Sequence, residues 1–101
     1  NTYSLTHVEA ATGALALSGT LSVVAGDLLV LVPFATTSNF VGLTYTGASE
    51  VSSPAQNGNV AAFSGVAVQT ITSTNASYAY GINWTSGANN PALVAAIIRR
   101  V

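Results

Sequence analysis

Hydrophobic and polar residues alternate with a period of two along much of the chain. In residues 15–23, every odd position except Gly19 is a large aliphatic and every even position is small or polar. That period is expected of a strand with one buried face, and Gly19 predicts a bulge or bend within it. After a turn at residues 24–26, residues 28–32 are apolar on both faces. Such a run is typical of a central strand covered on both sides, and Pro33 is expected to end it.

A second alternating segment, residues 77–84, is amphipathic in a different way. One face of this predicted strand holds Tyr78, Tyr80, Ile82 and Trp84. The other face holds only small or polar residues, which permit close approach by another sheet or backbone. We expect the aromatic face to lie in the core; the alternative is an exposed aromatic platform that stacks on sugars.

The rest of the pattern predicts shorter strands with polar connections between them. Strand candidates are residues 40–45, 60–63 and 66–72, the last two separated by a break or bulge at Ser64-Gly65. Residues 46–59 are predicted to form a long loop with at most a short strand at residues 49–51, and Asn57-Gly58 favours a tight turn there.

Residues 92–101 permit two interpretations. Asn90 followed by Pro91 is a pair that can begin a helix. The segment nevertheless has no helical periodicity and is rich in Val and Ile, which favours a buried final strand.

These elements predict an all-β fold. About eight strands with polar turns between them are typical of a single compact antiparallel β-sandwich, jelly-roll-like in connection, over residues 1–101. A length of 101 residues suits one domain with one core. An immunoglobulin-like sandwich is the main alternative, but the Cys-Trp-Cys framework of true immunoglobulin domains is absent because the chain has no cysteine.

Charge is scarce. Only 5% of residues are charged, against roughly 25% in an ordinary soluble domain. The complete set is Glu9, Asp27, Glu50, Arg99 and Arg100. Two arginines are too few to neutralise a phosphate backbone, so we expect no nucleic-acid binding. The apolar runs are shorter than the roughly 20 residues of a membrane-spanning helix, so we expect no membrane insertion.

A surface made mainly of Ser, Thr, Asn, Gly and Ala suits a protein packed against copies of itself or against another protein. We therefore expect a homo-oligomer with other protein subunits as partners. The alternative is a secreted domain whose neutral polar surface simply faces solvent.

Candidate chemistry is sparse. Glu9 and Glu50 are expected on the surface and not as a catalytic pair. Asp27 follows Gly26 at the beginning of a strand, where a carboxylate commonly accepts local backbone hydrogen bonds; the alternative, a calcium ligand, lacks an acidic cluster to complete the site. His7 has many serines as potential partners but no Gly-x-Ser-x-Gly motif. We expect no catalytic residues, no metal, no cofactor and no enzymatic activity.

Residues 20–32 carry a family resemblance. There a hydrophobic strand ends in Ala-Gly-Asp and continues as Leu-Leu-Val, which resembles a recurrent opening of small β-sandwich domains in tailed-phage virion proteins. The later strands agree in outline at residues 42–45, 77–84 and 93–98. The resemblance implies a capsid decoration (cement) protein and supplies no catalytic residue. This chain has no long arm, so binding would rely on its faces, on its N-terminal segment and on residues 46–59.

We therefore expect a structural virion protein on the capsid surface that binds the major capsid protein. The expected partner contacts are Tyr3, His7, Glu50, Asn57, Arg99 and Arg100. The arginines are expected either to bind carboxylates of the partner or to keep the end of the last strand in water. Two alternatives place the protein outside the cell: a secreted lectin-like or adhesin module, and a filament subunit assembled by strand exchange.

Overall fold

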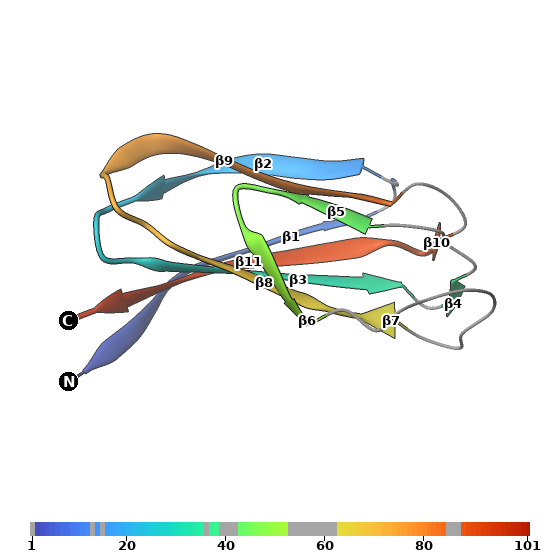
Figure 1. The fold of residues 1–101 in the computed structure, drawn as a ribbon, viewed down its shortest axis with the longest axis horizontal. Helices are drawn as coiled ribbons and strands as arrows, with labels where there is room; N and C mark the ends of the chain where they lie inside the picture. The colour runs from blue at the N-terminus through green and yellow to red at the C-terminus, as the bar shows by residue number, and fades with distance from the viewer. Residues whose placement is uncertain are drawn as a thin grey trace.

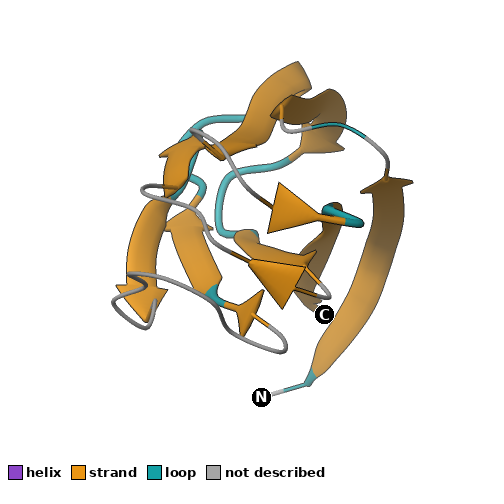
Figure 2. Ribbon diagram, turned by 90° about the vertical axis from the view of Figure 1, so that its right-hand side faces the viewer, coloured by secondary structure: helices purple, strands orange, loops and turns teal. Residues whose placement is uncertain are grey.

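The structure is a computed structural model that describes residues 2–12, 14, 16–35, 37–38, 43–52, 63–84 and 88–101. Their backbone forms strands and turns without a helix, as Figure 2 shows. The strands are β1 (Tyr3–Thr12), β2 (Ala16–Val23), β3 (Leu28–Ala35), β4 (Thr37–Ser38), β5 (Leu43–Thr46), β6 (Ser49–Ser52), β7 (Phe63–Ser64), β8 (Val66–Thr70), β9 (Asn75–Trp84), β10 (Ala88–Asn89) and β11 (Ala92–Arg100).

The strands build a sandwich of two main antiparallel sheets (Figure 1). The larger sheet has the order β1-β11-β3-β8-β6, with β7 pairing with β3 beyond β8. The smaller sheet has the order β2-β9-β5, and β4 pairs with β10 separately. The predicted β-sandwich is confirmed.

The connection is that of a jelly roll. Leaving out the two-residue strands, the first strand pairs with the last (β1 with β11), the second with the last but one (β2 with β9) and the third with the last but two (β3 with β8). This nested pairing is what results when one long hairpin is rolled up. It brings both ends of the chain to the same end of the sandwich (Figure 1).

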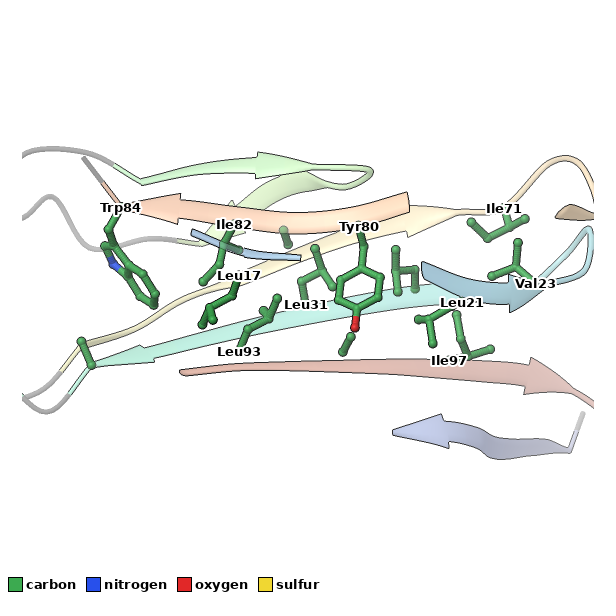
Figure 3. Close-up of a cluster of buried hydrophobic side chains, with 14 residues drawn as sticks. Leu17, Leu21, Val23, Leu31, Ile71, Tyr80, Ile82, Trp84, Leu93 and Ile97 are labelled. Atoms are coloured by element: carbon green, nitrogen blue, oxygen red, sulfur yellow. The ribbon is translucent and has the colours of Figure 1, made fainter. Parts of the chain in front are cut away.

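The core lies between the two sheets and is lined mainly by alternate residues of β2, β3, β9 and β11 (Figure 3). Tyr80, Ile82 and Trp84 point into it from β9, with Trp84 only 1% exposed. Leu29, Leu31 and Ile97 meet them from the larger sheet. The core position of the aromatic face is confirmed, and so is the final strand, because β11 is buried at every second residue.

Pro33 does not end the third strand, contrary to the sequence-based expectation. β3 continues to Ala35, and Pro33 is paired with Leu93 of β11. On the other side of Pro33 the partner strand is interrupted at Gly65, between β7 and β8, and the Gly65 N–H donates to the Pro33 carbonyl at 3.3 Å. In a strand, the N–H and the carbonyl of one residue point to the same neighbouring strand. The N–H that Pro33 lacks would therefore face the break at Gly65, where the ladder of hydrogen bonds is already interrupted.

Gly19 marks no bulge. It lies opposite Tyr80 in regular register, and the irregularity of β2 falls between Leu21 and Val23. A side chain at position 19 would meet the Tyr80 hydroxyl at 2.7 Å. Gly19 is therefore needed to leave room for the Tyr80 ring.

The first strand was not predicted from the sequence, whereas several other strands were predicted close to their observed positions. Residues 3–12 form an edge strand, β1, where no strand was predicted. The short strand predicted at residues 49–51 is present as β6, and the predicted break at Ser64-Gly65 separates β7 from β8. β9 begins at Asn75, two residues before its predicted start. The predicted turn at Asn57-Gly58 lies outside the described residues.

Candidate functional site

Asp27 and Arg99 form a two-point ion pair at the end of the sandwich that holds both chain ends. Arg99 Nε donates to Asp27 Oδ1 at 2.8 Å, and Arg99 Nη2 donates to Asp27 Oδ2 at 2.9 Å. The Asp27 side chain is 0% exposed and the Arg99 side chain 34% exposed. The pair joins the beginning of β3 to the end of β11, which are 72 residues apart in the chain.

The register of β3 and β11 explains why these two residues meet. Ile98 is paired with Leu28, so the next pair outward is Arg99 with Asp27. Both continue the inward-facing rows of their strands, Asp27 beside Leu29 and Arg99 beside Ile97. The ion pair thus closes the end of the hydrophobic core.

Asp27 also fixes the turn that carries the chain from the smaller sheet to the larger one. Its N–H donates to the Val24 carbonyl at 3.1 Å, and its Oδ2 accepts from the Val24 N–H at 2.9 Å. Gly26, the third residue of this turn, has φ of 97°, a conformation that glycine adopts without strain. The local backbone role predicted for Asp27 is confirmed.

The ion pair favours the charged form of both Asp27 and Arg99. The hydrogen bonds from Arg99 lower the pKa of the Asp27 carboxyl below its ordinary value of 3.8, outweighing the opposing effect of burial, and the Val24 hydrogen bond adds to the lowering. The same hydrogen bonds raise the pKa of the Arg99 guanidinium. Asp27 is therefore ionised at neutral pH.

A solvent-open hollow of about 410 Å³ lies over this ion pair. Its lining residues are Tyr3, Val24, Ala25, Gly26, Asp27, Arg99 and Arg100. Three of the six predicted contact residues, Tyr3, Arg99 and Arg100, thus lie around one hollow, because β1 and β11 pair Tyr3 with Arg100. Arg99, however, directs two of its guanidinium nitrogens to a carboxylate of its own chain.

The other predicted contact residues are not part of this hollow. His7 lies in β1 after an irregularity in its pairing with β11, and its side chain is outside the described part. Glu50 lies in β6, at the opposite edge of the larger sheet, and is exposed. Asn57 lies outside the described residues.

The outward side of the larger sheet is hydrophobic. Residues facing outward from β3, β8 and β11 alternate with the core residues and are half-buried or exposed. Together with Leu5 of β1, which is paired with Ile98, the apolar ones form a set that we call the outer apolar face: Leu5, Leu28, Val30, Val32, Phe34, Val66, Val68, Ala92, Val94, Ala96 and Ile98. Leu5 is 65% exposed and Phe34 41%. Among the described positions, the charged residue that continues this outward side is Arg100, at the end of β11.

This face corrects one expectation. Residues 28–32 were expected to be covered on both sides, but the fold covers only the side of Leu29 and Leu31, both 0% exposed. The side of Val30 and Val32 is only half-buried. The smaller sheet differs, because the outward residues of β2 are Ser18, Thr20 and Ser22, all exposed.

No protein-family model, curated protein or solved structure matches the chain. The functional argument therefore rests on the residues and their geometry. Within the described part of the chain, no helix has the length and hydropathy to cross a membrane. The described residues also contain no group of three or more His, Cys, Asp or Glu side chains placed to hold a metal ion.

Two aromatic side chains with polar groups are directed inward. The Trp84 indole N–H and the Tyr45 hydroxyl are buried and have no hydrogen-bond partner among the described residues. Burial raises the pKa of Tyr45 to about 12, and the charge of Glu50 contributes to the rise. Tyr45 is partly buried and packs against the core.

Proposed function

We propose that the protein is a structural subunit of a virion, a decoration protein that binds a capsid lattice and stabilises it by protein–protein contacts. The observation that carries the proposal is the outer apolar face. The larger sheet is hydrophobic on both sides, but its own fold covers only one of them. Such a sheet suits a protein whose open side is covered by another protein. The family resemblance of residues 20–32 supplies the kind of assembly.

The distribution of charge supports the same proposal. Most of the described surface outside the outer apolar face is neutral, so contact with another protein requires little desolvation of charge. Capsid proteins meet many copies of their neighbours at fixed geometry, and such contacts rely on shape and apolar burial more than on long-range attraction.

The lectin-like alternative is less well supported. The sugar platform considered for the aromatic face of β9 requires exposed rings there, whereas Trp84 is 1% and Tyr80 5% exposed. A second, polar hollow of about 220 Å³ at residues 69–75 includes Tyr78. Two of its polar groups already serve the fold: the Tyr78 hydroxyl donates to the Gly47 carbonyl at 2.6 Å, and Asn75 Oδ1 accepts from the Ser77 N–H at 2.8 Å.

Co-sedimentation tests the proposal. The purified protein is mixed with capsids stripped of it, from the phage whose genome encodes the chain, and in parallel with a glycan panel. Saturable binding to capsids with no retention on glycans is expected. Retention on glycans without capsid binding would overturn the proposal in favour of the lectin-like module.

A further inference from the structure

We propose that the hollow at the chain ends binds an acidic side chain, Asp or Glu, of the partner protein, with Arg99 and Arg100 donating to its carboxylate. This is the hollow of about 410 Å³ over the ion pair of Asp27 with Arg99. The proposal deepens the proposed function by naming the chemistry of the contact. It rests on that function only for the identity of the partner as a capsid protein.

The positive side-chain charge of the chain is gathered at this hollow. The chain has two arginines and no lysine, and both arginines line the hollow. Asp27 offsets one of them, so the lining carries a net positive charge. The other acidic residues lie elsewhere: Glu50 is in β6 at the opposite edge of the larger sheet, and Glu9 is paired with Ala95 along β1. The hollow therefore attracts an anion.

Arg99 has donors that its own ion pair does not use. Its hydrogen bonds to Asp27 use the Nε–H and one Nη2–H, which lie on one edge of the guanidinium plane. The Nη1 amino group lies on another edge, and the side chain is 34% exposed. Because the buried Asp27 carboxylate already holds the guanidinium in one orientation, little freedom is lost when a second carboxylate binds.

Arg100 joins the hollow to the outer apolar face. In β11 it follows Ile98 in the outward-facing row, and it is paired with Tyr3 of β1, which is 59% exposed. A protein that covers Ile98 and Leu5 therefore reaches Arg100 at the margin of its contact. The parallel N–H groups of a guanidinium match the two oxygens of a carboxylate, so an acidic side chain is the complementary group there.

Backbone hydrogen bonds fix the walls of the hollow. The Gly26 N–H donates to the Ile71 carbonyl at 2.7 Å, and the Ile71 N–H donates to the Asp27 carbonyl at 2.8 Å. On the other side, the Val101 N–H donates to the Thr2 carbonyl at 2.8 Å and extends the pairing of β1 with β11. A site whose walls are already in place binds its ligand without the cost of ordering them.

The charge of the lining favours a carboxylate over a phosphate. Two guanidinium groups and one carboxylate leave an excess of one cation, which a single Asp or Glu side chain balances. A phosphate group carries about two negative charges near neutral pH and would lie close to the Asp27 carboxylate.

Titration of the protein with small anions tests the site without a capsid. N-acetylglutamic acid α-amide presents the side-chain carboxylate, its glutamine counterpart is the neutral control, and inorganic phosphate is the competing anion. NMR follows the backbone amides and the Nε–H signals of the two arginines. We expect saturable shifts of the Arg100 Nε–H and the Gly26 amide at millimolar concentrations of the glutamate probe, and none with the glutamine probe.

Two substitutions that make the chain equally more negative separate a local contact from overall charge. Arg100→Gln removes the guanidinium, and Thr20→Glu adds a carboxylate on the exposed outer side of the smaller sheet. The Gly26 shift should be lost in Arg100→Gln and kept in Thr20→Glu, with the fluorescence of Trp84 as the check that each variant is folded. A missing shift in the wild type, a shift kept in Arg100→Gln, equal shifts with the glutamine probe, or tighter binding of phosphate would overturn the proposal.

Capsid binding by the same variants separates this proposal from the proposed function. Arg100→Gln should raise the dissociation constant for capsids about tenfold, whereas Thr20→Glu should leave it nearly unchanged. Equal capsid binding by Arg100→Gln and the wild type would overturn the assigned contact while the function stands. A wild type that binds the glutamate probe but no capsid would contradict the function and leave the carboxylate site intact.

Discussion

The Asp27 carboxylate accepts both Nε–H and Nη2–H of Arg99 and so fastens the last strand to the turn that joins the two sheets. With the Val24 N–H as a third donor, the buried carboxylate has its oxygens satisfied. The same ion pair forms the floor of the hollow at the chain ends. It is a structural element first, because it fixes the end of β11 against β3.

Asp27→Ala should lower the free energy of unfolding by about 3 kcal/mol, because it leaves the Val24 N–H and the Arg99 guanidinium without their acceptor. Arg99→Ala should also lower the free energy of unfolding, because it leaves a buried carboxylate without its counter-charge. The double variant should lose clearly less than the sum of the two, since the groups act as a pair. Urea unfolding of the four proteins measures this; additive losses would show that the pair is not coupled.

The acid dependence of stability should follow Asp27. Its pKa is lowered in the folded protein, so between the unfolded value of 3.8 and the folded value the unfolded chain binds the proton and the folded chain does not. The contribution is complete above that range and is lost as the pH falls through the folded pKa. Asp27→Asn, which cannot ionise, should show a weaker fall in unfolding free energy below pH 4 than the wild type. Identical acid profiles would contradict the assignment.

Tyr45 should make the protein sensitive to alkali. Its folded pKa of about 12 lies above the ordinary value of 10.0, so the unfolded chain releases the phenolic proton first and stability falls as the pH rises above 10. Tyr45→Phe should remove this fall and should leave stability at pH 7 unchanged or raise it by about 1 kcal/mol, because the buried hydroxyl has no partner among the described residues. Thermal unfolding at pH 7 and above pH 10 measures both; a loss of stability at pH 7 would contradict the prediction.

Gly26 and Gly47 provide a matched pair of turn glycines with positive φ, 97° and 79°. A side chain at position 26 meets nothing within 4 Å, so Gly26→Ala should cost only conformational strain, about 1 to 2 kcal/mol. A side chain at position 47 would collide with the Ala79 carbonyl oxygen, so Gly47→Ala should cost about 2 to 4 kcal/mol. Equal losses in urea unfolding would show that the backbone near Ala79 yields freely.

The fold was predictable from the sequence wherever one face of a strand is buried. β2 and β9 alternate strictly, so both strands and the inward direction of Trp84 followed from period two. β1 was missed because its apolar residues do not keep a period of two: the alternation of Tyr3 and Leu5 breaks where the pairing with β11 shifts register, between Leu5 and His7. Pro33 was misjudged because its tolerance depends on a break in a different strand, at Gly65, which local propensity does not reveal.

The candidate site was predictable only in part. Asp27 was recognised as a turn carboxylate, but its partner depends on the register of two strands far apart in the sequence. The chain has only five charged residues, so few ion pairs are possible. A prediction that the last strand pairs with the strand beginning at Leu28 would have placed Arg99 next to Asp27. The outer apolar face was visible as a run with two hydrophobic sides, but the sequence alone did not show that the fold covers just one of them.

The central claim is our proposal that the protein decorates a virion and stabilises its capsid, and the stability of virions with and without the protein tests it most directly. Release of the packaged genome is followed against temperature for complete particles, for particles from a phage that lacks this coding sequence, and for the latter after the purified protein is added back. The account predicts release at a lower temperature without the protein and recovery on adding it. Equal release temperatures in all three samples would contradict the account.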